Sequence, residues 1–213
     1  MQPLSQGSGP MGKEATTEQR RAQILAAAAA VFAGKGFHKA RMDDVARAAG
    51  LGKGTVYWYF ASKEELAISL VEIMQGVIPR QLADAAGEPG SVRERITAQM
   101  NRLAESLAAN SDTVLLTFEM YSLSYRVPEI RAYFIRFYTE LTGQFVRLLE
   151  QGVAAGELAE DTDVETVART LVSAVDGLSA RWALAPEDHD LRANLASTVA
   201  LILDAVTAKA KGE

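Results

Sequence analysis

Four aromatic residues in a row are the side chains best suited to specific contacts: Tyr57, Trp58, Tyr59 and Phe60. Adjacent residues of a helix point in different directions, so one short helix cannot bury four neighbouring rings on a single face. Packing alone therefore does not explain this run. We expect some of the rings to face outward, whereas Phe60 and the preceding Val56 are assigned to the core.

Catalytic and metal-binding chemistry has little support in the sequence. The chain has no cysteine and only two histidines, so thiol catalysis, disulfides and thiolate metal sites are excluded. It contains no nucleophile-base pair, no phosphate-binding loop and no metal-ligand spacing. His38 is assigned as structural or exposed, and no metal site is expected at His189 despite its acidic neighbours. We expect neither an enzyme nor a cofactor.

The segment from Met42 to Phe60 predicts two short helices joined by a tight turn. Gly50 is suited to the left-handed conformation that ends the first helix, and Gly52 opens the second. The small side chain of Ala46 leaves room where two helices cross steeply. This arrangement is a helix-turn-helix.

Basic charge is concentrated in the first third of the chain. The net charge is −5, but through Glu65 there are nine Lys and Arg against six Asp and Glu, and thereafter thirteen against twenty-one. This asymmetry fits a small DNA-binding head on an acidic body that does not touch phosphate.

Two stretches of the sequence, GLGKGTVYWYF at Gly50–Phe60 and SKEEL at Ser62–Leu66, resemble the signature of TetR-family transcriptional repressors. Phe37 and Met42–Ala46 match as well, and the close match covers about Arg20 to Leu70.

The resemblance assigns roles on double-stranded DNA to several of these residues. It implies that Tyr57 and Lys63 bind phosphates and that Tyr59 binds a phosphate or a base. The residues implied to enter the major groove are Lys53, Gly54, Thr55 and Trp58. Phosphate contacts would set the register, and base-edge contacts would carry the sequence information.

Two positions depart from the family pattern. Ala40 and Arg41 stand where the family usually has Ser or Thr, so the usual hydroxyl cap is missing, and Arg41 is a candidate to replace its phosphate contact. Gly52 replaces a Ser and is an N-cap weaker by about a few tenths of a kcal/mol. For Lys39 and Arg41, phosphate contact and plain surface both stay open.

Apolar residues at helical spacing predict an all-α protein of about nine helices. Residues 1–12 are assigned to a disordered tail, residues 13–62 to the helix-turn-helix DNA-binding domain, and residues 63–213 to a ligand-sensing and dimerisation domain. The first helix is expected to start near Thr16, and the helix from Ser62 to end at or before Pro79.

Other helix ends have local signals. Capping boxes are expected at Ser62–Glu65, Ser91–Glu94 and Thr162–Glu165. Gly36 is expected to end the first helix. A long helix should begin at Pro128 and stop near Gly152 or Gly156.

Most aromatic residues of the second domain fall on two predicted helices. The residues suited to line a cavity are Met74, Met100, Phe118, Tyr121, Tyr125, Phe134 and Tyr138, with Arg181 and Trp182 placed to close it. Such a pocket implies an apolar or aromatic small-molecule effector, with tyrosine hydroxyls as polar handles. A filled core is the alternative that stays open.

The last two predicted helices carry apolar stripes, from Val164 to Trp182 and from Leu191 to Val206. They are suited to packing against a second copy in a four-helix interface, as in the family, so a homodimer is expected. Asp176 lies inside the first stripe and needs a partner, either across the dimer or through an internal hydrogen bond.

These features predict a cytoplasmic, ligand-responsive repressor that binds a palindromic operator as a homodimer and is released by an apolar or aromatic small molecule. No membrane segment is expected, because the longest apolar stretch, Ile24 to Ala33, is shorter than the ~20 residues that span a bilayer. The rival is an architectural DNA-binding protein without an inducer, which would bind many sequences with similar affinity.

Overall fold

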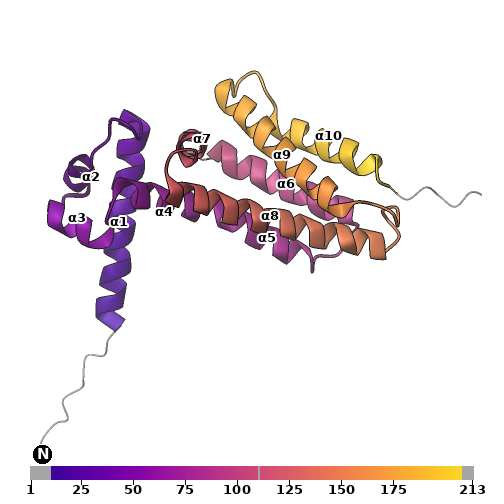
Figure 1. The fold of residues 1–213 in the computed structure, drawn as a ribbon, viewed down its shortest axis with the longest axis horizontal. Helices are drawn as coiled ribbons and strands as arrows, with labels where there is room; N and C mark the ends of the chain where they lie inside the picture. The colour runs from indigo at the N-terminus through magenta and orange to yellow at the C-terminus, as the bar shows by residue number, and fades with distance from the viewer. Residues whose placement is uncertain (1–10, 110, 208–213) are drawn as a thin grey trace, which may run out of the picture. The chain divides into compact units, whose positions relative to one another are not determined.

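The computed structural model describes residues 11–109 and 111–207, with the side chains of residues 11–16, 74, 77 and 111–113 left out of the description. Over these residues the helices are α1 (Met11–Lys35), α2 (Met42–Ala49), α3 (Lys53–Tyr59), α4 (Lys63–Gln75), α5 (Val77–Ala85), α6 (Val92–Ala109), α7 (Ser111–Ser124), α8 (Pro128–Ala154), α9 (Val164–Leu184) and α10 (Leu191–Asp204) (Figure 1). The all-α prediction is confirmed. The described part holds one isolated antiparallel bridge, between Leu158 and Thr207, and none of its helices is long and apolar enough to cross a membrane.

The chain divides into two compact units, which we call the head (Met1–Leu70) and the body (Val71–Glu213). The division falls eight residues later than the boundary expected after residue 62, and it lies inside α4. The first turns of α4 belong to the head because they pack there: Leu66 and Ala67 are fully buried, and Arg21 of α1 donates a hydrogen bond to Ser69 Oγ at 3.0 Å.

Helix α1 starts earlier than expected. It begins at Met11, so Thr16 lies inside the helix and is not its N-cap. The expected disordered tail falls on residues 1–10, which lie outside the described residues, and on two residues that are helical. The predicted end is confirmed: Gly36 has φ 72°, its N–H donates to Phe32 O at 2.8 Å, and the Phe32 and Phe37 rings lie 5.5 Å apart.

Helix α5 was not predicted. The helix from Ser62 was expected to end at or before Pro79, and α4 ends at Gln75, which confirms that end; α5 then starts at Val77. Proline occupies the third position of α5, where a backbone N–H would have no acceptor within the helix, so the ring costs no hydrogen bond there. Pro79 therefore lies in the first turn of a helix that the sequence analysis did not anticipate.

The caps of the body helices follow the sequence in most places. The N–H of Ser91 donates to Glu94 Oε2 at 2.8 Å, and the N–H of Glu94 donates to Ser91 Oγ at 3.2 Å, which confirms that capping box. The predicted box at Thr162 is wrong by one residue. Asp163 is the N-cap of α9, and its carboxylate accepts from the N–H of Thr166 at 3.1 Å. Helix α8 begins at Pro128 as predicted.

Within the body, α8 is the central element. It packs against α5, α7 and α9, and α10 packs against α6 and α9. The fully buried side chains of this core include Ile96 of α6, Leu148 and Leu149 of α8, and Leu171 of α9. Several helices thus surround α8 and place side chains around a common interior.

Candidate DNA-binding surface and ligand cavity

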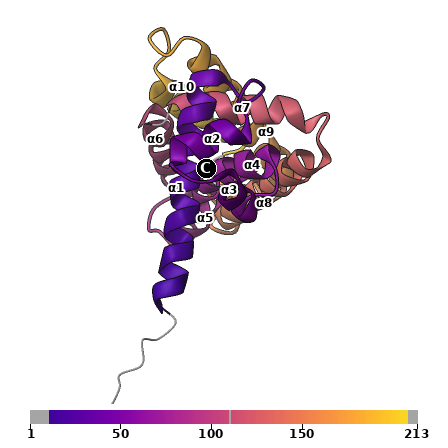
Figure 2. The ribbon, with the colours of Figure 1, turned by 90° about the vertical axis from the view of Figure 1, so that its left-hand side faces the viewer.

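The head forms the predicted helix-turn-helix from α2 and α3, which lie beside α1 (Figures 1 and 2). Gly50 ends α2 in the left-handed conformation with φ 66°. Its N–H donates to Arg47 O at 3.2 Å, and the N–H of Leu51 donates to Ala46 O at 2.9 Å. These bonds satisfy the last carbonyls of α2 and fix the turn into α3.

Helix α3 presents its aromatic residues as the residue pattern predicted. Val56 and Phe60 are fully buried, whereas Trp58 is 74% exposed and Tyr57 is 44% exposed. Tyr59 is half-buried, and its ring meets the Trp58 ring edge to face at 4.7 Å. An exposed tryptophan on a short helix leaves a large apolar surface in water, which is typical of a contact surface.

The polar residues of α3 share the exposed face. Lys53, Gly54 and Thr55 are all exposed. The Lys53 ammonium lies 2.8 Å from Asp43 of α2, and this hydrogen bond raises the pKa of Lys53. Both partners are more than half exposed, so the pair is weak and can open when a phosphate or a base edge competes for the lysine.

Lys63 has a role in the head that the sequence did not reveal. Its ammonium donates to Phe37 O at 2.7 Å, to Ala40 O at 3.1 Å and to His38 O at 3.4 Å, and it lies 4.2 Å from the centre of the Phe37 ring. An ammonium has three donors, and all three are directed at the turn between α1 and α2. Lys63 therefore holds that turn, and its contact with phosphate stays a prediction.

Asp44 supplies one half of a capping box at the start of α2. The N–H of Arg41, the N-cap residue, donates to Asp44 Oδ2 at 3.1 Å. The same carboxylate pairs with Lys35 of α1 at 2.7 Å, and the hydrogen bond from Lys35 is the largest of the effects that lower the pKa of Asp44. The side chains of Arg41 and Lys39 are exposed, which is compatible both with a phosphate contact and with a plain surface position.

The body contains a cavity of about 580 Å³ between its helices. Five of the residues proposed from sequence line it: Met100, Phe118, Tyr121, Phe134 and Tyr138. Their rings cluster, with Tyr121 at 5.3 Å from Phe134 and 6.2 Å from Tyr138, and Phe134 at 6.2 Å from Tyr138. The aromatic cluster therefore borders a cavity, and the binding of a ligand by these residues stays a prediction.

Tyr125, Trp182 and Arg181, which were also proposed from sequence, do not line the cavity. Tyr125 follows the end of α7, so it leaves the helical face of Tyr121 and is 69% exposed. The lining contributed by α9 ends at Ala180, so Trp182, although buried, and the exposed Arg181 lie beyond it. The side chain of Met74 lies outside the described residues.

Sequence reasoning missed most of the polar lining. The polar residues that line the cavity without having been proposed are Gln75, Gln81, Gln99, Ser106, Thr117, Asp176 and Ser179. Gln99 is almost fully buried and donates to Gln81 O at 3.0 Å, whereas Ser179 Oγ is buried with no hydrogen-bond partner in the described part of the chain. A polar residue at a core position of an apolar helix was the sequence signal that could have indicated this polar lining. The sequence analysis singled out such a residue at Asp176.

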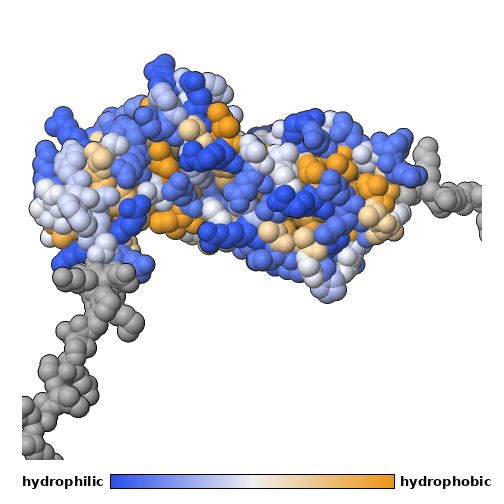
Figure 3. Space-filling model, turned by 60° about the horizontal axis from the view of Figure 1, so that its bottom comes forward, coloured by the Kyte–Doolittle hydropathy of each residue, from blue (hydrophilic) through white to orange (hydrophobic). Residues whose placement is uncertain are grey.

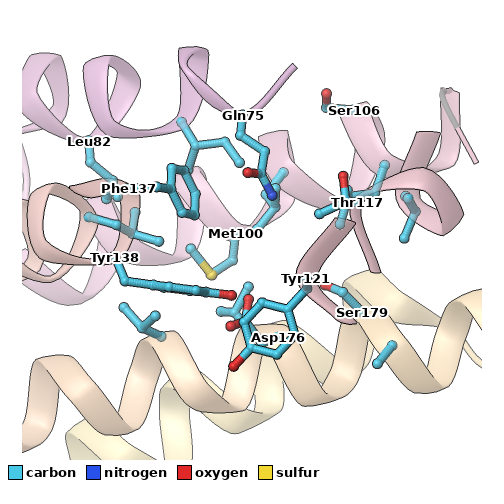
Figure 4. A pocket seen from close by; sticks show the side chains of 18 of the residues that line it. Gln75, Leu82, Met100, Ser106, Thr117, Tyr121, Phe137, Tyr138, Asp176 and Ser179 are labelled. Atoms are coloured by element: carbon cyan, nitrogen blue, oxygen red, sulfur yellow. The ribbon is translucent and has the colours of Figure 1, made fainter. Parts of the chain in front are cut away.

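Asp176 and Tyr138 meet in the cavity, where Tyr138 and Tyr121 point toward the carboxyl group (Figure 4). Burial raises the pKa of Asp176, and a hydrogen bond with Tyr138 partly offsets this effect. Burial and the nearby Asp176 raise the pKa of the Tyr138 hydroxyl. The partner that Asp176 needed is thus an internal one.

An exposed helix-turn-helix in the head and a separate helical body are the architecture of a DNA-binding transcriptional regulator. Residues 24–70 match the family model described as bacterial regulatory proteins, tetR family, and residues 89–207 match the C-terminal domain of BetI-type transcriptional repressors. The chain belongs to the TetR family of transcriptional regulators, whose members are not enzymes.

Relatives and solved structures support this placement. An uncharacterised regulator of the helix-turn-helix type from Bacillus subtilis, YfiR, is 33% identical over 76% of this chain and 78% of its own length. The regulator FadR from Bacillus subtilis, solved with stearoyl-CoA, has a TM-score of 0.75 at 24% identity, covering 86% of this chain and 98% of that one. The SmeT-triclosan complex has a TM-score of 0.79 at 22% identity, covering 91% and 93%.

Proposed function

We propose that this protein is a ligand-responsive repressor that binds a palindromic operator as a homodimer and is released when an apolar or aromatic small molecule enters the body. The observation that carries the proposal is the pairing of an exposed recognition helix, with Trp58 in water, and an aromatic cavity in a separate unit. An architectural DNA-binding protein has no use for such a cavity.

The DNA contacts follow from the exposed face of α3. Lys53, Gly54, Thr55 and Trp58 would read base edges in the major groove, and Tyr57 and Tyr59 would contact the backbone. Gly54 supports a close approach, because nothing lies within 4 Å of a side chain built there and its own lack of one lets the helix lie deep in the groove.

Dimerisation is proposed through α9 and α10. Leu184 at the end of α9 is 84% exposed and Leu201 of α10 is 72% exposed. These helices lie at the top of Figure 1, and the view from below in Figure 3 shows that apolar residues gather in patches on another face as well. Exposed leucines on two neighbouring helices fit a four-helix interface with a second copy.

The effector is proposed to act by selecting one of two arrangements of the dimer. Only an arrangement that places the two recognition helices ~34 Å apart, one turn of DNA, can fill successive major grooves. A ligand that binds the other arrangement more tightly shifts the population and lowers the affinity for the operator. Solved relatives of this fold hold stearoyl-CoA and triclosan, which supports an apolar ligand here.

The first test is selection of bound sites from a random duplex pool at near-physiological salt, with the mass of the protein measured in parallel. We expect an enriched palindromic site and the mass of a dimer. Binding to many sequences with similar affinity would instead support the architectural reading and overturn the proposal.

A further inference from the structure

Asp176 is an acidic residue in a cavity that is lined mainly by apolar and aromatic side chains. It lies on α9 among apolar and aromatic neighbours, and no Lys, Arg or His is found among the described residues that line the cavity. Asp176 is half-buried, and a carboxylate that is partly withdrawn from water without a cation nearby is destabilised unless another group compensates for it. Nothing within the described lining supplies a positive charge.

The groups that face Asp176 are neutral. Tyr138 of α8 and Tyr121 of α7 point toward it (Figure 4), and both lie close enough for its charge to raise the pKa of their hydroxyls. Both phenols have raised pKa values, so neither loses its proton at physiological pH. These neutral hydroxyls can orient the carboxylate, but they do not balance its charge.

Three aromatic rings stand beside this charge. Tyr121, Phe134 and Tyr138 lie within 5.3 to 6.2 Å of one another, measured between ring centres. Aromatic rings grouped in this way attract organic cations through the negative potential of their faces. Carboxylate and rings together offer both an ion-pair partner and an apolar enclosure for the same ligand group.

We propose that the effector is a lipophilic organic cation whose positive group pairs with Asp176 within these three rings. The inference rests on the proposed function and adds the charge of the ligand to it. A ligand whose anionic group enters the cavity is disfavoured, because that group would meet Asp176 with no basic residue in the described lining to balance it. The cavity volume of about 580 Å³ suits a ligand with several aromatic rings or an alkyl chain.

The test compares two probes of nearly equal shape and opposite charge, tetraphenylphosphonium and tetraphenylborate. Calorimetric titration of the full chain should show that tetraphenylphosphonium binds at least about tenfold more tightly, as expected for a hydrogen-bonded charge. Asp176→Asn should remove most of this preference. Asp176→Glu should retain it, and Glu165→Gln, an exposed carboxylate on the same helix, should leave it unchanged.

Thermal melts of each variant establish that the loss of preference is not a loss of folding. If Asp176→Asn does not fold, the comparison of wild type with Asp176→Glu and the two probes still decides the charge of the ligand. The proposal is overturned if the wild-type protein fails to bind tetraphenylphosphonium, if it binds both probes equally, or if Asp176→Asn keeps the preference.

Operator binding separates this proposal from the proposed function. If tetraphenylphosphonium binds through Asp176 but does not change affinity for the selected operator, the cation site stands and ligand-triggered release is wrong. If it does not bind while a neutral aromatic compound such as biphenyl lowers operator affinity, release stands and the cation proposal is wrong.

Discussion

Replacing Lys63 by methionine tests whether this lysine holds the head together or binds DNA. The change keeps most of the apolar stem and removes the ammonium that donates to Phe37 O, Ala40 O and His38 O. A hydrogen bond from a charged group contributes about 1.5–3 kcal/mol. Water can reach the freed carbonyls of this half-buried site, so we expect a net loss of about 2 kcal/mol for the turn rather than the sum of three bonds.

Hydrogen exchange on the full chain measures this loss where it occurs. A loss of about 2 kcal/mol corresponds to exchange about 30-fold faster for amides that depend on the turn. The informative amides are those of Ala40, bonded to Gly36 O, and Val45, bonded to Arg41 O. Lys39→Met is the matched control, because Lys39 is an exposed lysine of the same turn and its replacement should leave exchange unchanged.

The salt dependence of DNA binding distinguishes the two roles of Lys63. If the ammonium is fully engaged by carbonyls, Lys63→Met weakens binding on all sequences through the looser head, and the slope of log K against log salt stays the same. A phosphate contact would release counterions, so its loss would lower the slope by about one. A lower slope with unchanged exchange would refute the structural role argued here.

Four further changes test other parts of the structure. Trp58→Ala should change the free energy of unfolding by no more than about 0.5 kcal/mol, as thermal melts would show. It should weaken binding to the selected site about tenfold or more, as binding titrations would show. A large loss of stability would contradict the exposed position of Trp58. Gly50→Ala should destabilise the head by about 1–2 kcal/mol, measured by denaturant unfolding, because a side chain is strained at φ 66°. The pKa of Asp44 is lowered in the folded state. Its contribution to stability is therefore present above the ordinary pKa of the unfolded chain and is lost as the pH falls through the lower folded value. Asp44→Asn should flatten the dependence of stability on pH in this acidic range. The pKa of Asp176 is raised in the folded state, so the folded protein holds this proton more tightly than the unfolded chain. Stability therefore falls as the pH rises from the pKa of the unfolded chain to that of the folded protein. In melts without ligand, Asp176→Asn should raise the stability at neutral pH.

The helix-turn-helix could be predicted from sequence because its signals are local. The turn needs a left-handed residue at Gly50, the crossing needs the small Ala46, and a helix of two turns cannot hide four rings. Each constraint acts over a few residues, so composition and spacing were sufficient. Helix α5 was missed for the opposite reason, since Pro79 is compatible with either the end of one helix or the first turn of another.

The body was less predictable because its cavity depends on packing between helices far apart in sequence. The aromatic positions of α7 and α8 were found from their helical spacing, but Gln81 of α5 could not be placed without that helix. Trp182 was expected to close the cavity, but periodicity does not tell where along α9 the lining ends. The role of Lys63 also depends on a contact across 26 residues, which no local pattern encodes.

Departures from ordinary packing occur at the two sites where a ligand is expected. A sequence that specifies one fold normally buries its tryptophans and exposes its carboxylates, and exceptions are expected at functional sites. Here Trp58 is exposed on α3, Asp176 is half-buried beside aromatic rings, and Ser179 Oγ in the same cavity is buried with no partner among the described residues. Each of these groups is poorly satisfied in the free protein. DNA would cover Trp58, and a polar or cationic ligand would supply partners for Asp176 and Ser179. Interactions that are missing in the free protein would thus form on binding and would favour the bound state.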